Sequence, residues 1–158
     1  LDPLVLLVRD TKANRFVNSH KIIFAEAPEK RGYYQFAQWV EPPTDRVTLL
    51  IVERFERVGV FRSVSRIASS TLGDFQLNTE ILEFYHDISR TPGFVRITLS
   101  AELVNLVDRK EVVQKKFTCD VPVEVYNAEG AVRAFTIGTN RLLNELVSWT
   151  ADAAAATH

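Results

Sequence analysis

The chain has 158 residues, of which 46% are apolar, 25% charged and 10% aromatic. This composition is typical of one globular domain and excludes a collagen-like, disulfide-stapled or largely disordered chain. The 19 basic and 20 acidic side chains give a formal charge of −1, which argues against binding nucleic acid through an excess of positive charge. We predict a single domain over residues 1–150 and a flexible C-terminal tail over residues 151–158.

Short strands are predicted in the first forty residues. Residues 4–8 and 22–25 are apolar runs separated by a polar stretch. Residues 33–40 carry aromatic side chains with a period of two, which is typical of a strand. The first part of the chain therefore contributes three strands.

An amphipathic helix is predicted over residues 44–58. The prolines before it cannot continue a strand ladder, and Thr44 and Asp45 offer an N-cap and a carboxylate in the first turn. Gly59 is suited to a left-handed C-cap. Apolar side chains spaced by four, four and three form one stripe: Val47, Ile51, Phe55 and Val58.

Residues 75–88 form a long extended segment whose apolar pattern changes parity. Its apolar positions are odd at first (Phe75, Leu77, Ile81) and even afterwards (Leu82, Phe84, Ile88). In a regular strand the two halves would present opposite faces to the core. We therefore predict a bulge or bend between Thr79 and Phe84.

The next two strands are predicted over residues 95–103 and 113–125, which alternate apolar and polar side chains. With residues 75–88 they form an antiparallel meander with one wet side. Cys119, the single cysteine, falls on the apolar face, so we interpret it as a buried small residue and not as a reactive thiol. The predicted fold class is α/β, with a mixed, largely antiparallel sheet covered by two main helices.

The second main helix follows Asn127, which is predicted to be its N-cap. Gly138 lies on the apolar stripe of this helix, with Phe135 and Leu142. Glycine in a helix interior costs about 1 kcal/mol relative to alanine. We expect that Gly138 allows the helix to approach the sheet closely.

No catalytic, metal or cofactor site is predicted. The histidines are scattered, and no cysteine pair or phosphate-binding glycine motif is present. His86, Asp87 and Ser89 are close in sequence, but His86 and Asp87 point to opposite faces of a regular strand. We interpret them as polar residues at a strand end, so we expect the protein not to be an enzyme.

An aromatic cluster is the best candidate for a binding site. Alternation places Tyr34 and Phe36 on one face of their strand and Tyr33 and Trp39 on the other. If one face meets the core, the other needs a cover, so this strand could form a protein interface or the wall of an apolar pocket. Complete burial within one chain is the alternative. We expect at least one of the four rings to be exposed.

The sequence has no methionine, so we expect that a segment has been removed from its front. That segment could be a signal peptide, a lipid-attachment site or a membrane anchor. No apolar stretch reaches the roughly 20 residues that a membrane-spanning helix needs.

Several segments resemble the ABC-type transport auxiliary lipoproteins, the PqiC-like family. The most specific is Gly-Tyr-Tyr-Gln-Phe-Ala-Gln-Trp-Val-Glu-Pro-Pro at residues 32–43. The others are residues 1–8, 61–64, 77–87 and the final helix with Phe135, Leu142 and Trp149. The resemblance covers nearly the whole chain, although the cysteine that receives the lipid is absent, since Cys119 lies in a strand.

The resemblance implies a non-enzymatic accessory subunit of an Mce/ABC-type lipid transport system of the cell envelope. Such a subunit acts in the periplasm by docking and assembly, generally anchored to the outer membrane by an N-terminal lipid. Its implied partners are Mce-type or other periplasmic transporter subunits, or a second copy in a homo-oligomer. The alternative is a carrier that binds an apolar small molecule or lipid within its fold, which would need an internal cavity of roughly 300 Å³ or more.

Overall fold

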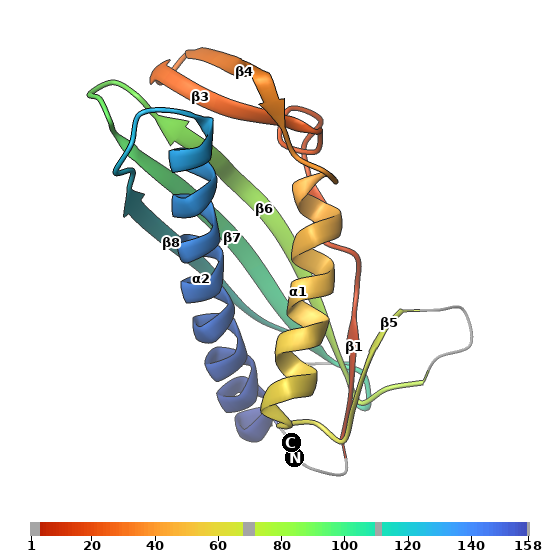
Figure 1. The fold of residues 1–158 in the computed structure, drawn as a ribbon. Helices are drawn as coiled ribbons and strands as arrows, with labels where there is room; N and C mark the ends of the chain where they lie inside the picture. Colours follow the sequence, from red (N-terminus) through yellow and green to blue (C-terminus); the bar gives the residue numbers. More distant parts are fainter. Residues whose placement is uncertain (1–3, 68–71, 110–111, 158) are drawn as a thin grey trace.

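β6 (Phe75–Asp87) is the strand around which the sheet is organised (Figure 1). The structure is a computed structural model that describes residues 4–67, 72–109 and 112–157. The other strands are β1 (Val5–Val8), β2 (Lys12–Ala13), β3 (Lys21–Ala27), β4 (Lys30–Gln38), β5 (Ser63–Arg66), β7 (Phe94–Asn105) and β8 (Val112–Pro122). The helices are α1 (Pro43–Val58) and α2 (Ala128–Thr157).

The two edges of β6 have different partners. One edge pairs antiparallel with β7, which pairs antiparallel with β8, so the predicted meander is confirmed. The other edge pairs in parallel with β1, β2 and β3 in succession. β5 pairs in parallel with β1, and β4 pairs antiparallel with β3.

The sheet is mixed, but the expectation that it is largely antiparallel is wrong. Within the described ranges, four strand pairings are parallel and three are antiparallel. The antiparallel pairings join strands that follow one another in sequence, which alternation and turns reveal. The parallel pairings bring distant segments together, and a short apolar run looks the same whichever partner it has.

The predicted bulge in β6 is confirmed. Ile81 pairs with Leu99 and Glu83 pairs with Thr98, so Leu82 is the extra residue on β6. Before it, the odd positions face the core; after it, Phe84 and His86 are buried. The single inserted residue therefore lets both halves of a 13-residue strand contribute to one core.

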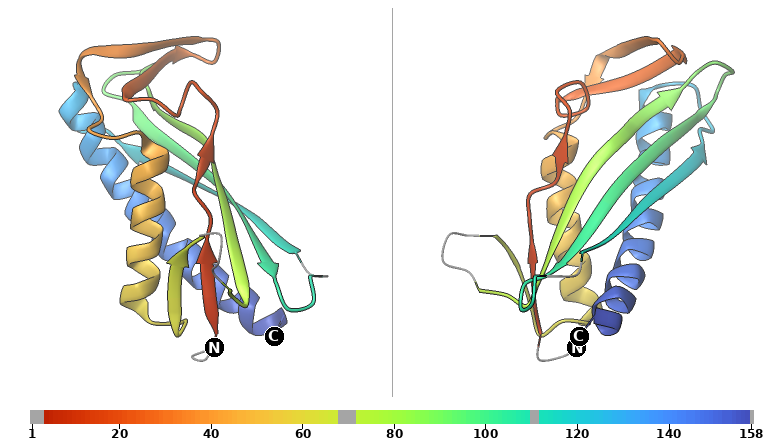
Figure 2. Two further views of the ribbon diagram at one scale, coloured as in Figure 1. Left: turned by 90° about the vertical axis from the view of Figure 1, so that its right-hand side faces the viewer. Right: turned by 180° about the vertical axis from the view of Figure 1, so that it is seen from behind.

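Both helices cover the same face of the sheet (Figures 1 and 2). α2 packs on β7 and β8, and α1 packs nearer β1 and β5. A Cβ atom built on Gly138 would lie 3.0 Å from Cδ1 of Ile97 and 3.2 Å from Cγ2 of Val121. This confirms that Gly138 allows a close approach of α2 to the sheet. Cys119 is buried on the same face of β8, as expected.

α1 occupies nearly the predicted range, but its N-terminus differs. Pro42 is the N-cap residue and makes no side-chain cap, and Asp45 lies in the first turn. The hydroxyl of Thr44 does not cap the helix, because it donates a hydrogen bond to Oδ1 of Asn18 at 2.6 Å. Gly59 closes the helix with a φ of 74°, as predicted for a left-handed C-cap.

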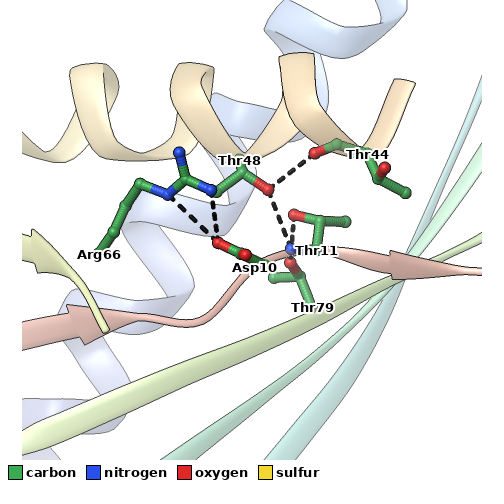
Figure 3. Close-up of polar contacts among 6 residues, drawn as sticks. All are labelled: Asp10, Thr11, Thr44, Thr48, Arg66 and Thr79. Atoms are coloured by element: carbon green, nitrogen blue, oxygen red, sulfur yellow. Dashed lines mark hydrogen bonds and ion pairs between the residues drawn. The ribbon is translucent and has the colours of Figure 1, made fainter. Parts of the chain in front are cut away.

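Threonine hydroxyls fasten α1 to the segment between β1 and β2 (Figure 3). The backbone N–H of Thr11 donates to Oγ1 of Thr48 at 2.9 Å, and that hydroxyl donates to the carbonyl oxygen of Thr44 at 2.7 Å. The hydroxyls of Thr11 and Thr79 lie 2.9 Å apart. Helix, connecting segment and central strand are thus joined by buried polar contacts.

The predicted flexible tail is helical as far as the structure describes it. α2 continues to Thr157, and Ala153 and Ala154 are buried. Nδ2 of Asn105 donates to the carbonyl oxygen of Thr157 at 3.1 Å, which ties the end of the helix to β7. The alanine-rich sequence has the highest helix propensity, so the helix does not stop at Thr150. His158 lies outside the described residues.

Neither helix of the described chain is long and apolar enough to cross a membrane.

Candidate functional site

The aromatic strand β4 is irregular where its aromatic side chains lie. Gln38 pairs with Lys21 and Tyr33 pairs with Ile23, so residues 34–37 lie opposite the single residue Ile22. β4 has no other strand partner in the part of the chain that the structure describes. The strict alternation predicted for residues 33–40 is therefore wrong, because the strand bulges outward at an edge of the sheet.

The bulge leaves Phe36 in solvent. Its side chain is 98% exposed, which confirms that at least one of the four rings is uncovered. Tyr33 is 38% exposed; its ring lies 5.4 Å from that of Phe16 and under the ammonium group of Lys21. Tyr33 and Phe36 line a surface depression together, and Tyr34 borders it as well. We call Phe16, Tyr33 and Phe36 the β4 patch.

Trp39 and Tyr34 point the other way and are half-buried. The ring of Trp39 lies 5.7 Å from Phe84 of β6 and 5.4 Å from Phe135 of α2, and those two rings stack at 4.5 Å. The structure thus brings Trp39 into the core and separates it from Phe36. The aromatic cluster divides into two sites.

A groove opens beside Trp39 between the N-terminal halves of α1 and α2. It has a volume of about 600 Å³. Phe84 of β6 and Phe135 of α2 are buried lining residues, as are Pro43 and Val47 of α1. The other lining residues come from the segment after β4 and from the two helices: Trp39, Val40, Glu41, Pro43, Arg46, Val47, Leu50, Thr136, Thr139 and Asn140. We call it the α1–α2 groove.

Arg54 lies next to the groove, one helical turn beyond Leu50 on α1. Its guanidinium donates through Nη2 to Oδ1 of Asn140 at 2.7 Å and through Nη1 to Oδ1 of Asn144. These bonds join α1 to α2 beside the groove, and Trp39 packs on Phe135 where the groove borders the segment after β4. Sequence reasoning missed this groove, because its walls are distant in the chain and no motif marks it.

His86 is buried and hydrogen-bonded through both ring nitrogens. It is fully buried, its Nδ1 lies 2.8 Å from the Tyr34 hydroxyl, and its Nε2 lies 2.7 Å from the carbonyl oxygen of Pro92. Burial lowers the pKa of His86, and the hydrogen bond to Pro92 and the charge of Asp87 offset only part of this. Burial raises the pKa of Tyr34, with a smaller contribution from Tyr126.

The residues considered for catalysis do not form a triad. Oδ1 of Asp87 accepts hydrogen bonds from the backbone N–H and the hydroxyl of Ser89, at 3.0 and 2.6 Å. Both nitrogens of His86 are engaged elsewhere, as described above. The expected separation of His86 from Asp87 is thus confirmed. No group of three or more metal-ligating side chains was found among the described residues.

Comparison with known proteins gives a family. The model of the ABC-type transport auxiliary lipoprotein component family matches residues 2–147. The crystal structure of protein XCC0632 from Xanthomonas campestris, described as family-model DUF330, is 26% identical with a TM-score of 0.89, covering 99% of this chain and 90% of that one. No functionally curated protein matches the sequence.

Two further solved structures share the fold at low identity. The hypothetical protein CT253 from Chlamydia trachomatis is 11% identical with a TM-score of 0.64, covering 96% of this chain and 98% of that chain. A PelC dodecamer from Paraburkholderia phytofirmans is 11% identical with a TM-score of 0.54, covering 95% of this chain and 86% of that chain.

Proposed function

The chain belongs to the ABC-type transport auxiliary lipoprotein family, and from this we propose that it is a non-enzymatic accessory subunit of an Mce/ABC-type lipid transport system. It acts in the periplasm by docking and assembly. The observation that carries the docking role is Phe36, a large ring held 98% exposed by the bulge in β4. A phenyl ring in water is unfavourable in the free protein, and its burial against a partner recovers that free energy.

The placement of the β4 patch supports this role. The start of β1 and the end of α2 lie at one end of the domain, and the β3–β4 hairpin lies at the other (Figures 1 and 2). α2 has 30 residues, which corresponds to about 45 Å of helix. A lipid attached ahead of β1 would hold the first end at the outer membrane. The β4 patch would then face away from that membrane, toward a subunit reaching across the periplasm.

The partner that we propose is an Mce-type or other periplasmic subunit of the transporter. A second copy of the chain is the other candidate partner, because PelC, which has the same fold, was solved as a dodecamer. The hydrogen bonds of His86 to Tyr34 and Pro92, and of Ser89 to Asp87, leave these three residues without a His–Asp pair, which supports a role without catalysis.

The test is the association of a Phe36→Ala variant. Sedimentation velocity over a concentration series, alone and with the Mce-type subunit, measures self-association and docking. We expect the melting temperature to stay unchanged, because Phe36 contacts little within the chain, and one association to weaken by about 2 kcal/mol, or roughly 30-fold.

The matched control is Ile137→Ala, an apolar residue that is 46% exposed on α2. It should leave both associations as in the wild type. If Phe36→Ala behaves like Ile137→Ala in both experiments, the β4 patch is not the docking surface.

A further inference from the structure

The α1–α2 groove has the size of a ligand site. Its volume of about 600 Å³ lies within the range of roughly 300–1,000 Å³ found for small-molecule pockets. Three rings that contact one another form one end of it: Trp39, Phe84 and Phe135. The groove is open to solvent at the fully exposed Val40 and at Arg46, and so differs from the enclosed cavity that we expected of a carrier.

Along its two helical walls, the groove offers an occupant few free polar groups, and among the uncharged side chains there only the Thr139 hydroxyl has no hydrogen bond within the described residues. Its two long walls are helices, whose backbone N–H and C=O groups bond within the helix. Oδ1 of Asn140 accepts from Arg54, and its Nδ2 donates to the carbonyl oxygen of Thr136. The hydroxyl of Thr136 donates to the carbonyl oxygen of Val132. An extended peptide would leave its own backbone groups without partners here, whereas a hydrocarbon chain has none to satisfy.

The mouth of the groove carries one positively charged side chain, Arg46, and one negatively charged side chain, Glu41. Arg46 lies on the first turns of α1, and its exposed guanidinium makes no ion pair or hydrogen bond within the described parts of the chain. Glu41 lines the groove as well, and no ion pair joins it to Arg46 there. A guanidinium matches a carboxylate with two parallel hydrogen bonds.

We propose that the α1–α2 groove binds a long-chain fatty acid, with the acyl chain along Leu50, Phe135 and Phe84 and the carboxylate at Arg46. This site is separate from the β4 patch, since Phe36 is not among its lining residues. The inference therefore does not depend on docking. The Phe36→Ala variant should bind the fatty acid as the wild type does, so the two proposals can fail independently.

The position of the ligand can be tested with the two tryptophans of the chain. Trp39 lines the groove, whereas Trp149 lies farther along α2 against Phe117. Stearic acid brominated in the middle of its chain quenches nearby indole fluorescence. In Trp149→Phe it should quench the remaining Trp39 saturably, and in Trp39→Phe the remaining Trp149 should keep its fluorescence. Equal quenching of both residues, or none of Trp39, overturns the proposal.

A second variant tests whether the carboxylate of the fatty acid binds at Arg46. Arg46→Gln should weaken stearate binding at least about tenfold, the expected effect of losing a charge-assisted hydrogen bond. It should leave binding of the uncharged stearyl alcohol unchanged, measured by displacement of the brominated acid. Arg57→Gln, at an exposed position in the last turn of α1, is the matched control and should bind both ligands as the wild type does. If Arg46→Gln binds stearate normally, or if an apolar peptide displaces the acid and stearyl alcohol does not, the proposed ligand is wrong.

Discussion

The hydroxyl of Tyr34 lies 2.8 Å from Nδ1 of His86, so both nitrogens of this buried imidazole have a hydrogen-bond partner. Nε2 of His86 faces the carbonyl oxygen of Pro92, which can only accept, so Nε2 is protonated. Nδ1 then accepts from Tyr34 in the neutral ring. Because burial lowers the pKa of His86, the neutral form is the one that the fold selects.

The buried imidazole predicts a pH dependence of stability. The unfolded chain binds a proton at His86 near pH 6.5, whereas the folded chain does so only at lower pH. Between these two values the unfolded state holds more protons, so the free energy of unfolding falls as the pH decreases. The slope from this residue is at most about 1.4 kcal/mol per pH unit, and above pH 7 it vanishes.

The measurement is urea unfolding between pH 5 and pH 8 for wild type and His86→Gln. Glutamine can still donate to the carbonyl oxygen of Pro92 but does not titrate. The variant should be less stable at neutral pH and should lose less stability on acidification below pH 6.5. Parallel pH profiles for the two proteins would contradict the neutral, buried state of His86.

The buried threonines at α1 predict a contrast between two substitutions of Thr48. Thr48→Val keeps the shape of the side chain and leaves the backbone N–H of Thr11 without its acceptor. An unsatisfied buried donor costs about 1–3 kcal/mol. Thr48→Ser retains the hydroxyl and should cost clearly less. Equal losses in thermal or urea unfolding would show that the hydroxyl contributes nothing.

The close contact at Gly138 predicts that leucine and alanine at this position affect stability to different extents. Gly138→Leu should lose roughly 1–3 kcal/mol because the added side chain meets Ile97 and Val121. Gly138→Ala should change stability by less than about 1 kcal/mol, since the gain in helix propensity opposes a tight contact with Cδ1 of Ile97.

A double-mutant cycle separates these two contributions to Gly138→Ala. Ile97→Val removes the Cδ1 atom, so Gly138→Ala should be more favourable in the Ile97→Val background than in the wild type. Identical effects in the two backgrounds would mean that the contact with Ile97 carries no cost.

The bulge in β6 predicts that the strand tolerates deletion of Leu82 better than deletion of a residue in its regular part. Deleting Leu82 removes the extra residue, so the ladder with β7 becomes regular while Ile81 and Phe84 still face the core. We expect this variant to keep a cooperative unfolding transition, which circular dichroism on heating can check. Deleting Asn78, which lies in the regular part of the ladder, would turn the residues on one side of it to the opposite face and should abolish that transition. Loss of cooperative unfolding on deletion of Leu82 would show that the fold requires the bulge itself.

Local patterns predicted the parts of the fold that depend on neighbouring residues. The parity change at Ile81 and Leu82 predicted the bulge, and the position of Gly138 on an apolar stripe predicted its contact with the sheet. The pairing of β6 with β1, β2 and β3 could not be predicted, because it joins segments that no turn connects.

The two candidate sites could also be predicted from the sequence only as far as they depend on neighbouring residues. Aromatic side chains on both faces of residues 33–40 indicated a surface ring, but the choice of Phe36 depends on a bulge opposite Ile22 that no residue type signals. The α1–α2 groove depends on how two helices and the segment after β4 come together, through contacts between distant residues such as Trp39 with Phe135 and Arg54 with Asn140.

The parallel pairings along β6 also have a consequence for the order in which the chain can fold. Leu6 pairs with Phe75 and Phe24 with His86, contacts about 60 to 70 residues apart in sequence. Closing such loops costs entropy before the contacts form, which places this topology among the slower folders. A nascent chain therefore carries the apolar segment Val5–Val8 without any strand partner until β5 has emerged, and without its partner in the centre of the sheet until β6 has emerged. The hairpins of β6, β7 and β8 can form without waiting, so we expect them to provide the template on which the N-terminal strands later assemble.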